Sequence, residues 1–198
     1  MPSPDQILAG LTSIANEWRS VAIVWHVVLA LSLTAMLAGW RPSTRVAGYA
    51  LVTPLVSVAA AAFTSGNPFN GAIFTTLLLV FASVASRLSR EPIHVGEPHV
   101  IVAGVMLVGF GAAYPHFVET NGWSTYVYAA PLGLLPCPTL SAVMGASLAF
   151  RLFDSRPWAF TLAAAGSFYG AVGAIALDVK LDYVLLAGAS VVVASVFR

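Results

Sequence analysis

Few side chains in this sequence have the chemistry to bind an ion or move a proton, and three of them lie in or beside apolar stretches. His26 lies inside a long apolar stretch, and His116 closes another, three residues before Glu119. Histidine changes its charge near neutral pH, and apolar surroundings penalise any ionisable group. These residues therefore indicate an ion-binding or proton-relaying site. For His26 a structural role is the alternative to a functional one, and in that role the ring hydrogen-bonds to a carbonyl of a neighbouring helix.

The most distinctive run is residues 130–139, Ala-Pro-Leu-Gly-Leu-Leu-Pro-Cys-Pro-Thr, which contains three prolines. Proline has no N–H to donate, and its ring clashes with the preceding helical turn. We therefore expect a broken or strongly kinked segment packed inside the protein. Carbonyl groups freed at such a break coordinate substrates and ions in membrane transporters. Pro136, Cys137 and Thr139 are accordingly candidate solute- or ion-binding residues, and a purely structural kink explains the prolines equally well.

Cys137 is the only cysteine of the chain, so it has no partner for an internal disulfide. Its thiolate would suit a soft metal such as Cu(I), and with His26 and His116 it completes the candidate metal ligands. No motif defines a metal or haem cofactor, so the cofactor is left open. We favour the interpretation of Cys137 as a small buried packing residue. No pairing of a nucleophile with a base is visible, which argues against a hydrolytic enzyme.

A short polar hairpin, containing Asp178, Lys180 and Asp182, separates the last two apolar stretches. In one interpretation its aspartates line a polar vestibule together with the histidines and Glu119. In the other, which we favour, they are ordinary solvated loop residues.

Composition defines the class of protein that must position these groups. Of the 198 residues, 59% are hydrophobic and 9% are charged, and the mean hydropathy is +0.86. Soluble domains contain about 45–50% apolar and about 25% charged residues. The formal charge of +1 provides no basic excess for nucleic acid. The chain is therefore predicted to be an integral membrane protein whose partner is the lipid bilayer.

A membrane-spanning helix needs about 20 mostly apolar residues, and the sequence contains seven candidate stretches. Residues 1–20 precede them and are predicted to form an amphipathic segment at the membrane interface, while 21–198 form a seven-helix transmembrane domain. The proline run falls near mid-membrane in the fifth stretch. The predicted spans are Val21–Trp40, Val46–Thr64, Gly71–Ser86, Val100–Phe117, Tyr126–Phe150, Trp158–Leu177 and Tyr183–Phe197.

The basic residues alternate with these spans. Lysine and arginine gather in cytoplasmic loops, so the alternation predicts an outside N-terminus and a cytoplasmic C-terminus. Arg19 and Lys180 lie on the predicted outer side. The seven on the predicted cytoplasmic side are Arg41, Arg45, Arg87, Arg90, Arg151, Arg156 and Arg198.

The Leu-Pro-Cys-Pro-Thr run at residues 135–139 resembles a motif found late in the chain of a family of uncharacterised bacterial multi-pass membrane proteins. The Asn-Glu-Trp stretch at 16–18 is similar to the N-terminal region of that family, and a loose likeness covers most of the chain. Where the family tends to have a longer polar stretch in the second span, this sequence has four alanines at 59–62. The resemblance implies a multi-pass protein of a bacterial cytoplasmic (inner) membrane and brings no activity with it.

Together these features predict an all-α, seven-helix membrane bundle that transports or binds a small solute or ion. The pathway is expected to be an outward-facing polar cavity that runs past the two histidines to the break in the fifth helix. One alternative is a redox or sensor module that holds a metal or haem. Another is an accessory subunit with no site of its own, and the sequence also allows a homo-oligomer.

Overall fold

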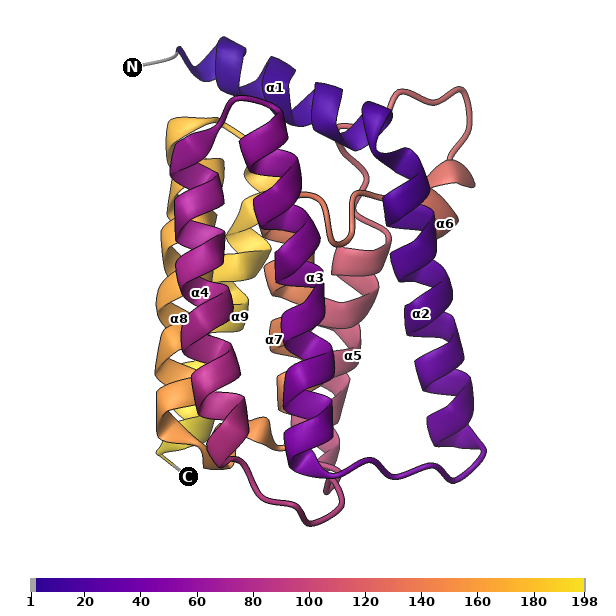
Figure 1. Cartoon of the computed structure of the whole chain (residues 1–198), viewed down its shortest axis with the longest axis vertical. Helices are drawn as coiled ribbons and strands as arrows, with labels where there is room; N and C mark the ends of the chain where they lie inside the picture. Colours follow the sequence, from indigo (N-terminus) through magenta and orange to yellow (C-terminus); the bar gives the residue numbers. More distant parts are fainter. Residues whose placement is uncertain (1–2, 198) are drawn as a thin grey trace.

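The computed structural model describes residues 3–197, and the regular secondary structure of this part of the chain is all helical, with one isolated bridge between Ser43 and Pro92 and no strand (Figure 1). The α-helices are α1 (Pro4–Glu17), α2 (Arg19–Leu37), α3 (Thr44–Thr64), α4 (Pro68–Arg87), α5 (Pro98–Ala112), α6 (Thr125–Ala129), α7 (Pro136–Ala149), α8 (Arg156–Ala171) and α9 (Tyr183–Val196). Three short elements complete them: a 3-10 turn η1 (Leu152–Asp154), a π-helical turn η2 (Val172–Ala176) and a 3-10 turn η3 (Lys180–Asp182).

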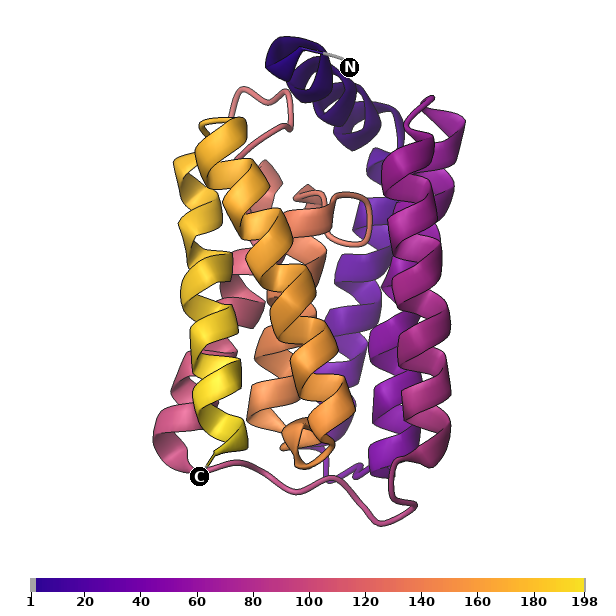
Figure 2. The same cartoon turned by 90° about the vertical axis from the view of Figure 1, so that its left-hand side faces the viewer.

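Helices α2 to α5 and α7 to α9 run along the long axis of the molecule, and α1 lies across one end of them (Figures 1 and 2). We call this the α1 end. The opposite end is the arginine end, because the connections from α2 to α3, from α4 to α5 and from α7 to α8 lie there. These connections and the helix ends beside them contain Arg41, Arg45, Arg87, Arg90, Arg151 and Arg156.

Four of these helices are long and apolar enough to cross a membrane, judged by length and composition over the described residues. They are α2, α3, α4 and the continuous helical segment Arg156–Ala176 formed by α8 and η2. Helix α5 is apolar but shorter. The chain is therefore an all-helical protein with the character of a membrane-embedded one.

The helix starts follow from local sequence. Ser3 caps α1 in a capping box with Gln6, and Ser43 accepts a hydrogen bond from the Val46 N–H at the start of α3. At α4 the Asn67 side chain does the same for Asn70, and Pro68 supplies the first helical residue. Such caps satisfy N–H groups that have no partner within the helix. The polar residues between apolar stretches therefore fix where each helix begins.

The N-terminal segment that was predicted to be amphipathic contains the helix α1, which is buried on one side. Ile14 is buried and Ile7, Leu8 and Leu11 are half-buried, whereas Asp5 is exposed. Its apolar face is therefore turned toward the bundle end that it covers.

Two kinds of packing hold the bundle core together. Helices α5 and α7 approach so closely that a Cβ on Gly104 would stand 2.6 Å from the carbonyl oxygen of Gly145. Small residues permit such close helix contact in membrane bundles. On the α8 side large rings fill the space instead: Phe81 lies 4.8 Å from Trp158 and Phe74 lies 5.3 Å from Tyr169, measured between ring centroids.

The predicted break in the fifth apolar stretch is confirmed, because the chain is not helical from Ala130 to Leu135. Pro136 is the first residue of α7 and Pro138 lies in its first turn. Proline is well placed there, since the first N–H groups of a helix have no partner within it. The two prolines therefore begin a new helix and do not kink an existing one.

The fourth predicted span was too long, because α5 ends at Ala112 and not at Phe117. Pro115 disfavours a helical conformation for Tyr114 before it. Phe117 has a φ of 70°, which also ends a right-handed helix. The freed segment turns back over the α1 end of the bundle.

Candidate functional site

The non-helical segment 130–135 is buried and is held by side-chain hydrogen bonds. The Thr139 hydroxyl accepts from the Gly133 N–H at 2.9 Å and donates to the Leu135 carbonyl at 2.7 Å. The Ser57 hydroxyl of α3 accepts from the Trp25 indole N–H at 2.8 Å and donates to the Gly133 carbonyl at 2.6 Å. Gly133 has a φ of 72°, and a Cβ there would overlap the Trp25 ring. Thr139, a predicted site residue, therefore holds the broken segment in place, and Gly133 is the residue that lets Trp25 approach.

Next to this segment lies a cluster that we call the Asp182 centre, made of Tyr114, Cys137 and Asp182. The Tyr114 hydroxyl donates to Asp182 Oδ1 at 2.7 Å, and the Cys137 thiol donates to Asp182 Oδ2 at 3.1 Å. Asp182 is 2% exposed and Tyr114 is fully buried. The interpretation of Asp182 as a solvated loop residue is therefore wrong, and the thiol of Cys137 has a polar partner, which a purely apolar packing role does not include.

The local backbone explains how a loop aspartate comes to be buried. The last turn of the sixth apolar stretch widens into the π-helical η2, and the Val179 N–H folds back onto the Gly173 carbonyl at 2.8 Å. Asp178 turns the chain with a φ of 57°. A Cβ on Gly173 would overlap the Asp182 carboxylate. Glycine at 173 therefore leaves the space that the carboxylate occupies, and π-turns of this kind are frequent at functional sites.

Asp178 and Lys180, in contrast, behave as predicted. Both are exposed, and they form an ion pair with each other. The polar hairpin therefore divides into a solvated part and one buried acid.

The electrostatics of Asp182 are those of an acid without a cation. Burial raises the pKa of its carboxyl above the ordinary value, while the hydrogen bonds from Cys137 and Tyr114 and the charge of His116 act in the opposite direction. No Lys, Arg or His forms an ion pair with Asp182 within residues 3–197. A buried carboxylate without a counter-ion is costly, so this position favours a bound proton or cation.

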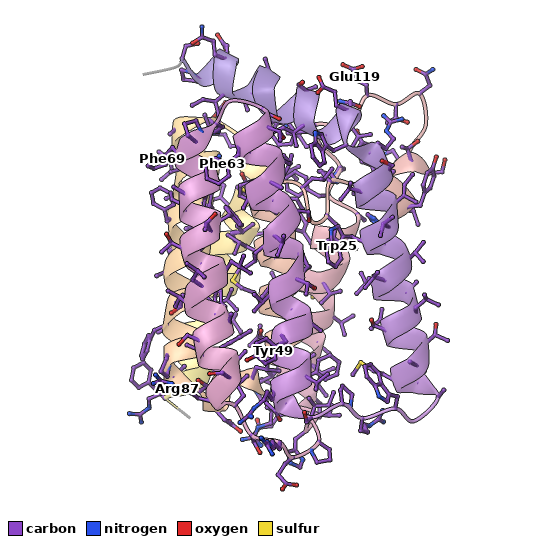
Figure 3. The ribbon with its side chains drawn as sticks, in the orientation of Figure 1. Trp25, Tyr49, Phe63, Phe69, Arg87 and Glu119 are labelled. Atoms are coloured by element: carbon purple, nitrogen blue, oxygen red, sulfur yellow. The ribbon has the colours of Figure 1, made fainter. Side chains whose placement is uncertain are left out.

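His116 and Glu119, both predicted site residues, lie together at a pocket at the α1 end. The pocket has a volume of about 420 Å³ and opens beside α1. Figure 3 places Glu119 at this end of the molecule. The residues that line it are Leu8, Thr12, His116, Phe117, Val118, Glu119 and Tyr126.

Aromatic rings separate this pocket from the Asp182 centre. The His116 ring packs 4.2 Å from that of Phe117, and the Phe117 ring lies nearly parallel to that of Tyr114 at 6.3 Å between centroids. Tyr114 in turn reaches Asp182 with its hydroxyl. One layer of rings therefore lies between the open pocket and the buried acid.

The pocket wall is tied to α1 and α2. The Asn16 side chain donates to the Phe117 carbonyl at 3.0 Å and accepts from the Glu119 N–H at 2.9 Å. Arg19 donates to the Glu119 carbonyl at 2.7 Å. These bonds hold Phe117 in its left-handed conformation, which costs a non-glycine residue about 1 kcal/mol or more. The wall is therefore fixed by the junction of α1 with α2.

His26 is placed apart from this pocket and bridges two helices. Its Nδ1 lies 2.8 Å from the Ala22 carbonyl of its own helix, and its Nε2 lies 2.7 Å from the Ala112 carbonyl at the end of α5. A neutral imidazole donates to one of these carbonyls and an imidazolium donates to both. The contact with the Ala112 carbonyl therefore agrees with the structural interpretation of His26 as a helix-to-helix contact.

The structure thus joins His116 with Glu119 and joins Cys137 with two residues that were not among the predicted site residues, Tyr114 and Asp182. Pro136 is buried at the start of α7 and carries no polar contact of its side chain. For metals, no group of three or more His, Cys, Asp or Glu within the described part of the chain is arranged to hold an ion.

Comparisons of this chain with models of protein families, with curated proteins and with solved structures find no match. Its function is therefore argued from the Asp182 centre and the pocket beside it.

Proposed function

We propose that this protein is a seven-span helical bundle of a bacterial inner membrane that takes up a proton or small cation at Asp182 from the outer side, as part of the binding or transport of a small solute or ion. In this proposal α2, α3, α4, α5, the α6–α7 pair, α8 with η2, and α9 are the spans. The N-terminus lies outside and the C-terminus lies in the cytoplasm. The gathering of arginines at the end opposite α1 supports this orientation, because positive residues are retained on the cytoplasmic side.

The observation that carries the proposal is a buried carboxylate that accepts hydrogen bonds from a hydroxyl and a thiol and has no cationic partner among residues 3–197. Asp182 lies in the connection between the last two proposed spans, and a buried acid whose pKa is raised by burial is a candidate for a functional site. Asp182 is the one acid of the described residues that is buried. It is therefore the group best suited to exchange a proton.

The two neighbours of Asp182 suit both protonation states. When the carboxylate is ionised, the Tyr114 hydroxyl and the Cys137 thiol each donate to one oxygen. When it is protonated, the carboxyl becomes a donor itself. A hydroxyl and a thiol accept as well as donate, so one of them can turn to accept a hydrogen bond from the protonated carboxyl while the other continues to donate to it.

The route to Asp182 begins at the pocket at the α1 end. His116 is exposed there, and its charge acts on Asp182. The stacked rings of Tyr114 and Phe117 close the direct path. A small movement of Phe117, which the loop holds in a strained conformation, would open it.

Infrared difference spectroscopy of the purified full-length protein tests proton binding directly. We expect a protonated carboxyl band that titrates with pH, disappears in Asp182→Asn and persists in Asp178→Asn. The control is matched, because Asp178 is an exposed acid of the same loop and asparagine tolerates its left-handed backbone. An unchanged titrating band in the Asp182→Asn protein would overturn the proposal.

Transport is tested in liposomes that contain the protein and a pH-sensitive dye. A gradient of Na⁺ or K⁺ is imposed, one at a time, across the membrane. We expect a pH change inside the liposomes that is lost in Asp182→Asn and kept in Asp178→Asn. A response that does not depend on Asp182 would remove this residue from the pathway.

A further inference from the structure

A second pocket lies at the arginine end, far from the Asp182 centre, and has a volume of about 470 Å³. The connections after α4 and α7 and the first residues of α3 surround it. Its lining combines hydroxyl groups, charged side chains and apolar side chains. The residues are Thr44, Arg87, Leu88, Ser89, Glu91, His94, Phe150, Arg151, Leu152, Asp154 and Ser155.

Two arginines and two acids line this pocket, and Arg87 is the arginine outside the Arg151–Asp154 ion pair. Its guanidinium is exposed and has no hydrogen-bond or ion-pair partner among residues 3–197. Arg151 and Asp154 form an ion pair at 3.5 Å, which leaves that side of the lining neutral. Glu91 is the remaining acid of the lining and His94 its remaining base.

The surroundings of the pocket are positive. Within the described residues, the arginine end has six arginines against three acids, Glu91, Glu97 and Asp154. Arg90 and Arg156 stand beside the pocket in sequence without lining it. An anion that approaches this end is therefore attracted before it makes any contact.

The position of the pocket selects the kind of anion. Arg87 is the last residue of α4, and α4 packs against α8 (Figures 2 and 3). Above it the outer surfaces of both helices are apolar and open, with Leu79, Val80 and Phe160 exposed. A molecule with a phosphate at the pocket would therefore have its chains along an apolar helix surface.

We propose that this pocket binds the phosphate of an anionic phospholipid headgroup, with Arg87 as its main cationic contact and the hydroxyls of Thr44, Ser89 and Ser155 around it. Arginine forms paired hydrogen bonds with phosphate oxygens, and basic pockets at the ends of membrane helices bind anionic headgroups. The inference rests on the membrane character of the helices and is independent of the proton site at Asp182.

The test compares lipid-induced stabilisation of the purified full-length protein in detergent micelles. Phosphatidylglycerol is titrated into wild type and into Arg87→Gln, Arg87→Lys and Arg90→Gln, and the thermal unfolding midpoint is followed. We expect phosphatidylglycerol to raise the midpoint of the wild type and of Arg90→Gln. Apparent affinity should fall about tenfold or more in Arg87→Gln, because one charge-assisted contact is removed, and by a smaller factor in Arg87→Lys.

Two further arms identify the ligand. Phosphatidylcholine shares the phosphate but carries no net charge, and inorganic phosphate has no acyl chains, so neither should reproduce the stabilisation. Equal binding of phosphatidylglycerol by Arg87→Gln and Arg90→Gln would overturn the proposal. So would equal stabilisation by phosphatidylcholine, which would show a site for lipid without charge selection, or by inorganic phosphate, which would show a free-anion site.

Discussion

Removal of the Tyr114 hydroxyl is the sharpest test of the Asp182 centre. The change Tyr114→Phe deletes one oxygen and keeps the ring that stacks on Phe117. It breaks a buried hydrogen bond of 2.7 Å and leaves Asp182 Oδ1 without that donor. A hydrogen bond to a charged group contributes about 1.5–3 kcal/mol, and one between neutral groups about 0.5–1.5 kcal/mol. The loss of stability should therefore depend on whether Asp182 is ionised.

The sign of this dependence follows from the chemistry. At low pH the carboxyl is neutral, and the variant should lose the smaller amount. As pH rises through the pKa of Asp182, the loss should grow to about 1.5–3 kcal/mol, or about tenfold or more in the unfolding constant. The measurement is reversible unfolding of the protein in mixed micelles, followed by circular dichroism at a series of pH values.

Tyr128→Phe is the control for this experiment, because the Tyr128 ring is exposed and its hydroxyl bonds to no other described residue. It should change stability little at any pH. A loss in Tyr114→Phe that is equal to that of the control, or that is constant across pH, would refute the role assigned to the Asp182 carboxylate. A double variant that combines Tyr114→Phe with Asp182→Asn measures the coupling energy between the two residues. In the Asp182→Asn background, the loss of stability caused by Tyr114→Phe should no longer depend on pH.

Three further outcomes follow from other features of the bundle. Burial raises the pKa of Asp182 above its ordinary value of 3.8, so the folded protein keeps this proton to a higher pH than the unfolded chain does. Stability should therefore fall as pH rises from 3.8 through the pKa of the folded state. Thermal unfolding of Asp182→Asn should lack this decline. Gly104→Ala places a methyl against the backbone of α7 and should cost about 1–3 kcal/mol, whereas Gly109→Ala meets nothing within 4 Å and should match or exceed the wild type in the same unfolding assay. Ser147→Ala leaves the buried Trp158 indole N–H without its 3.0 Å acceptor and should cost about 1–3 kcal/mol by chemical denaturation, and a neutral result would mean that another acceptor replaces it.

The helices themselves were readable from the sequence, because long apolar stretches ended at charged or turn-forming residues. The stretch predicted as Val46–Thr64 is α3, Thr44–Thr64, and the break in the fifth stretch falls where the prolines predict it. The error at the end of α5 also has a local cause, since Pro115 and the left-handed Phe117 follow it. The span was predicted from apolar composition, which does not include the backbone effects of these two residues.

The Asp182 centre was not readable in the same way. Its hydrogen bonds join Asp182 to residues 45 and 68 positions earlier in the chain. No local pattern distinguishes Asp182 from its neighbour Asp178, although one is buried and the other exposed. Burial of a carboxylate at a helix start depends on which distant segment covers it, and that is decided by packing of α5, α7 and α9. The nearest local signal is Gly173 together with the small residues around it. This signal is not specific, because glycine in an apolar helix also permits close helix packing.

Helix α2 has a consequence for how the chain is made. It is synthesised before α3 to α9, yet the groups that hold it come much later in the chain: Ser57 for Trp25, Ala112 for His26 and residue 119 for Arg19, which are 32, 86 and 100 positions further along. Ala22 is the one buried residue of α2, more than half of its apolar residues are exposed, and Leu37 is 90% exposed. A helix forms its backbone hydrogen bonds within itself and needs no partner for them in lipid. Helix α2 is therefore able to remain in the membrane without its later contacts during synthesis. Synthesis of α2 before the helices that contact it is thus compatible with the fold, because α2 buries little of its surface against them.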